Sequence, residues 1–288
     1  MSQTYTTTAL VLKRRDHNEN DRLFCLYTKD YGKLDVLAKG TKKISSKLNP
    51  YMEPFYLVKV MIAKGKIFDK LANCNVIEGY QNLRKDLLGF ALINYLAEIT
   101  DNLIMGQTQS GEKFDLLIKT LEILEQEILK RAASADGLVR QAHHKLSKAN
   151  PELVEGLTMT ASAEKEKLLL IANLYGLKLL SLLGYQPEIK RCLICHKGIL
   201  LTKNIFDFSH GGVICEDCKK VCLIEDYVLV SDQVIKLLQL GQEKELDFFS
   251  NLGIDQDIIK QFNQVVYQLL LVNMERPLRS IDFLQKLP

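Results

Sequence analysis

Short apolar runs separated by turn residues fill the first 80 residues of the chain. The runs are TALVLKRR, RLFCLYT, KLDVLAKG, PFYLVKVMIAKG and KIFDKLANCNVIEGY, and they are rich in Val, Ile, Leu, Phe and Tyr, as strands are. One of the turns, DYGK, contains Gly32, which can take the positive φ of a hairpin turn. Five strands without a helix-length gap predict a small barrel. The oligonucleotide-binding (OB) barrel is one such fold, with its usual binding face on strands 2 and 3 and two loops.

From residue 82 the apolar period changes to that of helices. The runs LRKDLLGFALINYLAEITDNLI and KFDLLIKTLEILEQEILKR have apolar residues at helical spacing, which predicts amphipathic helices. The run EKEKLLLIANLYGLKLLSLLG is apolar nearly all round and predicts a buried central helix, ended by Gly184 and Pro187. SDQVIKLLQL and DQDIIKQFNQVVYQLLLVN predict two more helices, the last with Asp255 as its N-cap.

The segment at residues 132–163 interrupts this helical pattern. Its apolar stripe fades, and Gly, Pro, Ser and Asn recur in it. We expect an inserted connection that is partly disordered and at most partly helical. His143 and His144 lie here without candidate partners, so we interpret them as solvated.

Two C-x-x-C pairs lie in RCLICHKGILLTKNIFDFSHGGVICEDCKK, with nineteen residues between Cys195 and Cys215. This spacing is typical of a zinc ribbon with the ligands Cys192, Cys195, Cys215 and Cys218. Four thiolates leave no open position for a water molecule, so we expect a structural rather than a catalytic Zn²⁺. His196, His210 and Cys222 are second choices as ligands.

Composition places few further limits on function. The 288 residues are 47% hydrophobic and 25% charged, which is ordinary for a globular protein. We find no membrane span and no secretory signal, and the unevenly placed cysteines do not form a disulfide framework, so we expect a cytoplasmic protein. The sequence has no nucleotide-binding or catalytic motif, and we expect no enzymatic activity.

Positive charge is concentrated near the N-terminus. Residues 1–80 contain fourteen Lys and Arg against eight Asp and Glu, a balance of +6, whereas the remainder has a balance of −3. Clustered cations favour nucleic-acid binding because each neutralised phosphate releases counterions. The candidate DNA-binding residues are Arg14, Arg15, Lys33, Lys39, Lys42, Lys43 and Lys47. Solvated loop lysines that bind nothing are the alternative interpretation.

Several stretches together resemble the RecO family of bacterial recombination and repair mediators. ALVLKRRDHNENDRLFCLYTKDYGKLDVLAKGTKKISSK resembles the opening of that family, and LLSLLGYQPEIKRCLICHKG resembles its helix end leading into the first cysteine pair. FSHGGVICEDC resembles the return into the second pair, and ERPLRSIDFL resembles the closing helix. The resemblance covers residues 1–131 and 164–286.

The resemblance implies an α+β architecture with four parts. They are a five-stranded OB barrel at 1–80, a helical domain at 81–190, a zinc ribbon inserted at 191–222, and the rest of the helical domain at 223–288. Some members of the family lack the four cysteines, but this sequence keeps them, so the resemblance carries the metal site over. It likewise places Arg14, Lys39, Lys42 and Lys43 in matching strands and loops.

The function implied is that of a DNA repair and homologous recombination mediator. Such a protein binds single- and double-stranded DNA without sequence preference, anneals complementary strands, and helps to load RecA on DNA coated by single-strand-binding protein. The implied partners are RecR, in some members RecF, and the C-terminal acidic tail of single-strand-binding protein. We expect association with the bacterial nucleoid, and a groove near Arg276 or Arg279 as a place for the tail.

Two other classes of protein share some of these features. A zinc-ribbon interaction module of transcription or translation would bind protein or RNA and would not anneal DNA strands. A metal-dependent enzyme would hold an exchangeable metal with a bound water molecule, which a four-thiolate site disfavours.

Overall fold

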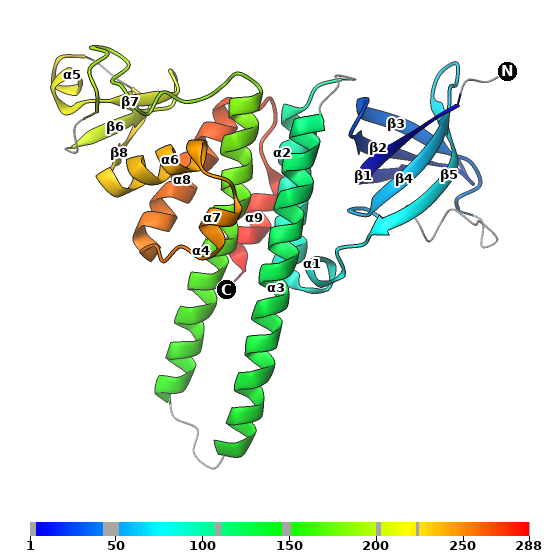
Figure 1. The fold of residues 1–288 in the computed structure, drawn as a ribbon, viewed down its shortest axis with the longest axis horizontal. Coiled ribbons are helices and arrows are strands. Elements are labelled where there is room, and N and C mark those ends of the chain that lie inside the picture. The colour runs from blue at the N-terminus through cyan, green and yellow to red at the C-terminus, as the bar shows by residue number, and fades with distance from the viewer. Residues whose placement is uncertain are drawn as a thin grey trace.

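The computed structural model shows an α+β protein with a five-stranded barrel at one end, a small three-stranded sheet at the other, and a helical body between them (Figure 1). The residues it describes are 4–42, 52–106, 111–145, 151–199, 203–222 and 225–287. This architecture confirms the predicted barrel and helical body. None of the helices in these ranges is long and apolar enough to cross a membrane.

The barrel is closed, with the strand order β1-β2-β3-β5-β4 and β1 paired to β4. Its strands are β1 (Thr4–Asp16), β2 (Arg22–Thr28), β3 (Gly32–Ala38), β4 (Leu57–Ala63) and β5 (Asp69–Glu78). The second half of β1 pairs with β2 and its first half with β4, so one long strand closes both sides. The predicted hairpin turn forms between β2 and β3, where Gly32 has a φ of 67°.

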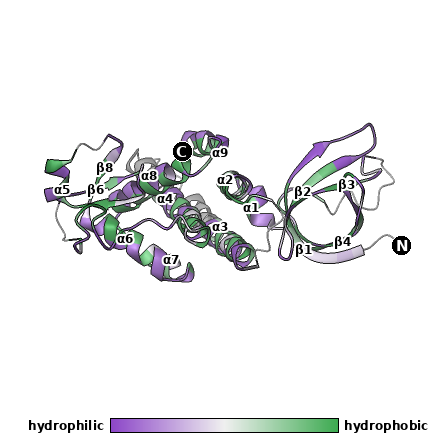
Figure 2. Ribbon diagram, turned by 90° about the horizontal axis from the view of Figure 1, so that it is seen from above, coloured by the Kyte–Doolittle hydropathy of each residue, from purple (hydrophilic) through white to green (hydrophobic). Residues whose placement is uncertain are grey.

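The strands differ in how many of their faces are buried. In β2 every residue after Arg22 is buried, whereas in β4 exposed Lys59 and Met61 alternate with buried neighbours. A strand whose two faces are both covered is apolar throughout, and a strand with one wet face alternates. The interior of the barrel covers one face of β2 through Phe24 and Leu26. Its other face joins the core of the helical body (Figure 2).

The helical body is built around a buried central helix, as the sequence predicts. Its helices are α1 (Gln81–Lys85), α2 (Leu87–Leu103), α3 (Gly111–Lys145), α4 (Pro151–Leu182), α6 (Asp232–Glu243), α7 (Asp247–Ser250), α8 (Gln256–Val272) and α9 (Arg279–Lys286). The C-terminal half of α4 contacts α2, α3, α6 and α8. Gly184 follows the helix with a φ of 89°, and the Asp255 side chain accepts the N–H of Asp257 at the start of α8.

A chain of buried polar side chains joins three of these helices. The Tyr95 hydroxyl of α2 donates to Asn173 Oδ1 of α4 over 2.7 Å, and Asn173 Nδ2 donates to Asn263 Oδ1 of α8 over 3.0 Å. Asn263 Nδ2 donates in turn to the Glu166 carboxylate over 2.8 Å. Because buried polar groups are costly unless paired, this chain fixes the relative register of the helices.

Residues 132–163 are expected from the sequence to be at most partly helical, but the described parts of this segment are helical throughout. Helix α3 continues to Lys145 and α4 begins at Pro151, so both ends of the segment are helical. Pro151 is the first residue of α4, a position that tolerates the missing backbone N–H of proline. The two helices run side by side away from the rest of the body (Figure 1), so they can form here without an apolar stripe that faces the core.

The small sheet has the strand order β7-β6-β8. It contains β6 (Asn204–Asp207), β7 (Gly212–Ile214) and β8 (Tyr227–Val230), with the short helix α5 (Glu216–Val221) after β7. Because β8 pairs with β6 along its whole length, the sheet extends beyond residue 222, the end predicted for the ribbon.

Candidate metal centre and nucleic-acid interface

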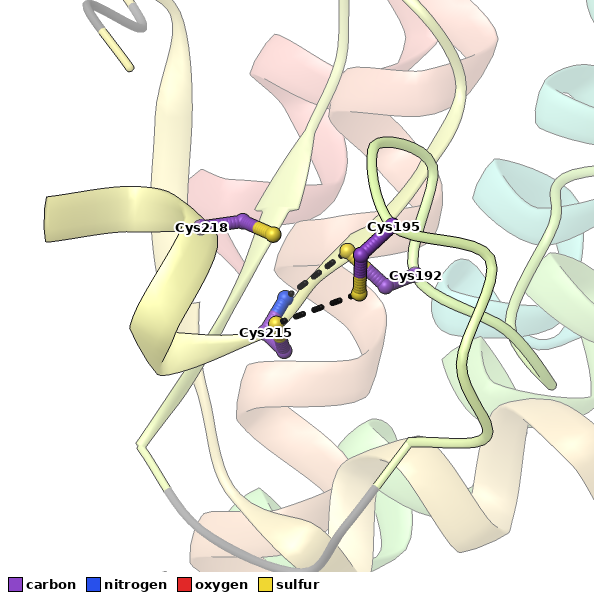
Figure 3. A group of neighbouring side chains, drawn as sticks. All are labelled: Cys192, Cys195, Cys215 and Cys218. Atoms are coloured by element: carbon purple, nitrogen blue, oxygen red, sulfur yellow. Dashed lines mark hydrogen bonds between the residues drawn. The ribbon is translucent and has the colours of Figure 1, made fainter. Parts of the chain in front are cut away.

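The four cysteines of the two C-x-x-C pairs converge at one end of the small sheet (Figure 3). Cys192 and Cys195 lie in the loop that precedes β6, Cys215 follows β7, and Cys218 lies in α5. Their four sulfurs lie within 4.8 Å of one another, and the sulfurs of Cys195 and Cys215 are 3.9 Å apart. Among the described residues this is the only such group of metal-ligating side chains.

Backbone hydrogen bonds shape the first cysteine loop and hold it against the second. The N–H of His196 donates to the Cys192 carbonyl over 2.9 Å, and His196 takes a φ of 57° to leave the turn. The N–H of Leu193 donates to the Val213 carbonyl over 3.0 Å. The second bond brings two segments twenty residues apart in sequence into contact, so both cysteine pairs face the same point.

The surroundings of Cys192 favour a thiolate. Burial disfavours the charged form, but backbone N–H groups of the two cysteine loops point at the sulfur and lower the pKa of Cys192 to about 6. Those of Ile194 and Cys215 lie 3.5 Å from it. Backbone donors of this kind stabilise a negative sulfur, which is the form that binds metal.

The arrangement fits one tetrahedrally coordinated metal ion. With metal–sulfur bonds of about 2.3 Å, the sulfurs of a tetrahedral zinc site lie roughly 3.8 Å apart, close to the distance between Cys195 and Cys215. Among the described residues, the buried cluster next to the site consists of Cys192, Ile205 and Ile214, while Phe206 and Val213 of the same sheet face the core of the helical body. So small a core rarely holds a fold without a metal or another cross-link. The four cysteines can therefore hold a metal ion that contributes to folding.

Most of the cations predicted to bind DNA are paired with carboxylates. Arg14 contacts Glu53 over 2.5 Å and Arg15 contacts Asp35 over 2.9 Å. Lys42 lies 2.9 Å from Asp16, and its hydrogen bond lowers the pKa of that carboxyl. These pairs reduce the positive potential of the side of the barrel on which they lie.

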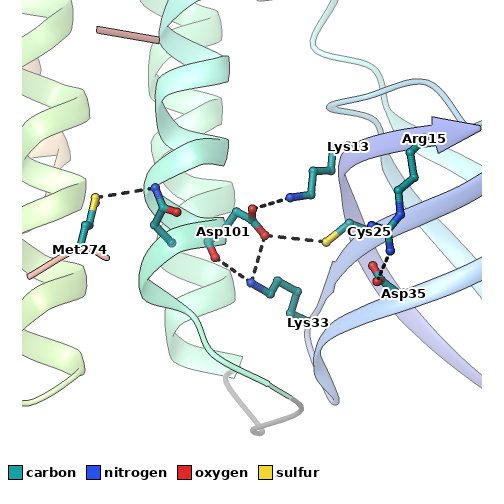
Figure 4. Close-up of polar contacts among 8 residues, drawn as sticks. Lys13, Arg15, Cys25, Lys33, Asp35, Asp101 and Met274 are labelled. Atoms are coloured by element: carbon teal, nitrogen blue, oxygen red, sulfur yellow. Dashed lines mark hydrogen bonds and ion pairs between the residues drawn. The ribbon is translucent and has the colours of Figure 1, made fainter. Parts of the chain in front are cut away.

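Lys33 lies at the junction between the barrel and the helical body (Figure 4). Its ammonium group donates to the backbone carbonyl of Asp101 over 2.7 Å and to the carboxylate of Asp101 over 3.0 Å. Lys13 contacts the same carboxylate over 2.6 Å. Both ammonium groups hold the pKa of Asp101 below its ordinary value although partial burial opposes this. Lys33 thus already has a role in docking the barrel.

Lys39 is exposed and makes no ion pair with the described part of the chain, although its charge lies near Asp21. Lys43 and Lys47 lie outside the described residues. The predicted cations are therefore not gathered into one unpaired cluster by the described barrel.

Other exposed lysines of the barrel were missed by the sequence reasoning. Lys59 on β4, Lys66 in the following loop and Lys70 on β5 are exposed, and no carboxylate of the described residues pairs with them. The alternation in LVKVMIA gives a signal that Lys59 points outward, because the strand period places its neighbours inside. No motif marks these residues, and their isolation from carboxylates becomes visible only in the fold.

Comparison with known proteins gives consistent matches along the chain. The family model "Recombination protein O N terminal" matches residues 1–80, and "Recombination protein O C terminal" matches residues 153–282. A DNA repair protein RecO of Thermoanaerobacter sp. is 28% identical over 98% of this chain and 97% of its own length. Those of Caldanaerobacter subterraneus and Dehalococcoides mccartyi are 27% and 25% identical over 98% of this chain, and over 97% and 96% of their own lengths.

Proposed function

The chain belongs to the RecO family of DNA repair proteins, and from this premise we propose that it acts as a mediator of DNA repair and homologous recombination. In this role it binds single- and double-stranded DNA without sequence preference and anneals complementary strands. It also helps to place RecA on DNA coated by single-strand-binding protein. We expect it to work at the bacterial nucleoid and without catalytic turnover.

The observation that carries this proposal is the closed five-stranded barrel with the OB strand order in the segment matched by the N-terminal family model. Barrels of this type bind nucleic acids by cationic tracks along the backbone and need no reactive group. Annealing requires that two phosphate backbones are screened while the bases stay free to pair. Lysines on a barrel surface meet that requirement better than a base-reading pocket does.

In this proposal the cysteine centre holds a structural Zn²⁺. Four thiolates in a tetrahedral arrangement fill the coordination sphere of zinc, so the ion has a structural role and cross-links the two cysteine loops of the ribbon. The four ligands are those predicted from the sequence, Cys192, Cys195, Cys215 and Cys218. Lys219 and Lys220 lie on α5 beside the site, and Lys220 is paired with Glu216 over 3.0 Å.

The proposed protein partners are RecR, in some members of the family RecF, and the C-terminal tail of single-strand-binding protein. A cavity of about 530 Å³ lies between β1, α2 and α9, with Phe90 and Phe283 in its lining and Arg279 at its edge. An apolar lining beside a cation suits an apolar peptide that ends in a carboxylate. Glu98, which also lines the cavity, accepts the N–H groups of Arg279 and Ser280 at the start of α9. We place the tail here, against the side chain of Arg279.

Strand annealing tests the proposed function directly. Two complementary fluorescent oligonucleotides are mixed without nucleotide cofactor over a range of salt, with and without single-strand-binding protein. We expect the protein to accelerate pairing, and the acceleration to weaken as salt rises because counterion release drives DNA binding.

A protein that neither binds DNA at low salt nor accelerates pairing would contradict the proposal. A preference for RNA without annealing would favour the zinc-ribbon interaction module instead. A metal-dependent activity that is restored when Zn²⁺ is returned to the apoprotein would favour the enzyme class.

A further inference from the structure

The usual nucleic-acid face of an OB barrel is largely occupied here by the protein itself. The outer face of β2 carries Cys25 and Tyr27, which belong to the core of the helical body. The Tyr27 ring lies 5.6 Å from that of Phe114 on α3, and Lys33 at the start of β3 is bound by Asp101 of α2. A nucleic acid cannot lie along this part of β2 without separating the barrel from the body.

Carboxylates offset most of the positive charge of the cleft that remains beside this junction. It has a volume of about 510 Å³, and its lining includes Lys13, Arg15 and Arg276. Lys33 lines it too, and the carboxylates of Asp35, Asp101 and Glu275 offset three of these four positive charges. A polyanion gains less from such a surface because Lys13, Arg15 and Lys33 are already paired with carboxylates.

The opposite side of the barrel is open and differs in charge. It is formed by the first half of β1 with β4 and β5, which pair side by side, and Figure 2 shows β1 and β4 along one side of the barrel wall. Residues directly opposite one another on paired strands share a face, so the register places Thr8, Lys59 and Asn75 in one row. The next row contains Thr6, Met61 and Asn73.

No carboxylate lies in these rows. A third row ends on Lys70, and Lys66 lies in the loop beyond it. Asp69, beside Lys70, is turned to other partners, since it accepts the Tyr5 hydroxyl over 2.7 Å and the N–H of Gly65 over 3.1 Å. This open face therefore carries lysines that are free to neutralise phosphates, among hydroxyl, amide and thioether groups.

We propose that the open face formed by β1, β4 and β5 is where the barrel binds single-stranded DNA, with Lys59 and Lys70 contacting its phosphates. The inference rests on the proposed DNA-binding function and specifies where on the barrel it resides. It departs from the expectation that strands 2 and 3 form the binding face.

The chemistry of the face suits a single strand that is bound without sequence preference. Lysines form salt-dependent contacts with phosphates that do not distinguish bases. Threonine hydroxyls and asparagine amides can each donate or accept a hydrogen bond, so they tolerate different bases. Met61 is 42% exposed at the centre and offers an adaptable apolar contact. An acidic protein could contact the same lysines. In that case the open-face variant would lose affinity for the protein and not for single-stranded DNA.

Two charge-neutralised double variants compare the two sides of the barrel. Lys59→Gln with Lys70→Gln changes the open face, and Arg15→Gln with Lys39→Gln removes the same charge from the side near β2 and β3. We expect the first variant to bind a single-stranded oligonucleotide about tenfold more weakly. Its salt slope should fall by roughly 1.4, since each lost contact with a single strand accounts for about 0.7. The matched variant should lose less than threefold.

A fluorescent reporter locates the DNA independently of charge. The sequence contains no tryptophan, so Met61→Trp places a single indole on the open face, and Phe248→Trp places one on α7 of the body as a control. Phe248 is 43% exposed, close to the value for Met61. Single-stranded DNA should quench the fluorescence at residue 61, because bases stack on indole, and leave that at residue 248 unchanged.

The outcomes separate this inference from the proposed function. If the wild-type protein binds no DNA, the proposed function fails and the inference fails with it. If the wild-type protein binds DNA but the matched variant loses as much affinity as the open-face variant, or more, the face is wrong while the function stands. Unchanged fluorescence of Met61→Trp at saturating DNA would overturn the inference in the same way. Circular dichroism and metal content of all variants show that each is folded.

Discussion

The barrel and the cysteine ribbon are both small β structures, but different interactions hold them together. The barrel has an interior core that includes Phe24, Leu26, Val60 and Ile62, all fully or almost fully buried, and its outer surface is anchored to the helices. The ribbon core contains Ile205, Ile214 and the ligand Cys192. The ribbon sheet also packs on the body through Phe206, Phe208 and Val213, but the buried cluster around its cysteines is small. We therefore expect hydrophobic burial to stabilise the barrel, and the cysteine end of the ribbon to depend more on a bound metal ion.

This contrast teaches that the same class of secondary structure can respond to different perturbations within one chain. Backbone hydrogen bonds, such as those donated by Leu193 and Val213, hold the cysteine loops against the neighbouring segments, but they place the four sulfurs close together without joining them. Binding of a structural zinc ion contributes roughly 10 kcal/mol or more in small metal domains. Loss of the metal should thus act on one end of the molecule and leave the other intact.

The largest expected effect is that of removing the metal. Cys192→Ser with Cys215→Ser takes one ligand from each pair of the proposed zinc site. We expect the wild type to bind one Zn²⁺ per chain, and the variant to lose this ion and to have an unfolded ribbon. Amide hydrogen exchange should become fast in residues 203–222 and stay slow in β1 and β4 of the barrel. Metal content by atomic emission and exchange by mass spectrometry measure the two effects.

Cys74→Ser is the matched control, because this cysteine is buried in the barrel and ligates nothing. Its metal content should equal that of the wild type. Fast exchange throughout the barrel of the ribbon variant would show that the two regions fold as one unit, which contradicts the contrast.

A smaller effect is expected from the barrel core. Ile62→Ala removes a fully buried side chain on β4 and should lower the free energy of unfolding of the barrel by about 2–5 kcal/mol. Met61→Ala, at the adjacent exposed position, should change it by less than about 0.5 kcal/mol. Urea denaturation followed by circular dichroism gives both values. Equal effects at the two positions, or loss of metal from either variant, would break the contrast.

Patterns that are local in sequence allowed correct prediction of the barrel strands, the central helix and the cysteine cluster. Short strands alternate or run apolar, the second half of α4 is apolar nearly all round, and a C-x-x-C pair brings two sulfurs together within one turn. The helical ends of α3 and α4 were not predicted because their apolar stripe fades, although Pro151 is a favourable first residue of a helix.

The state of the barrel cations could not be predicted because their partners are distant in sequence. Lys33 and Asp101 are 68 residues apart, and Arg14 and Glu53 are 39 residues apart. The sequence of a basic stretch does not show whether a carboxylate from elsewhere in the chain pairs with its lysines. The free charge of Lys59 and the engaged charge of Lys33 are set by how the barrel docks on α2, which no local pattern encodes.

The smallest expected effect concerns the docking of the barrel on α2. The barrel is joined to α2 by the ion pairs of Asp101 with Lys13 and Lys33, whereas the ribbon makes no contact with Asp101 among the described residues. Lys13 and Lys33 lower the pKa of Asp101 despite its partial burial, so folding is favoured by the charged carboxylate. This contribution is present above the ordinary carboxyl pKa of about 4 and disappears as the pH falls through the lower pKa of the folded state.

Asp101→Asn should therefore destabilise the barrel by about 1 kcal/mol or less at pH 7, as the loss of a partly exposed ion pair does. The difference from the wild type should shrink as the pH is lowered from 7 to 3. Urea denaturation at both pH values measures the difference in the free energy of unfolding. Asp115→Asn is the control, because Asp115 pairs with Lys29 and is more exposed than Asp101, so its effect should be smaller. A difference that persisted unchanged at pH 3 would mean that the shape of the Asp101 side chain, and not its charge, joins the barrel to the body.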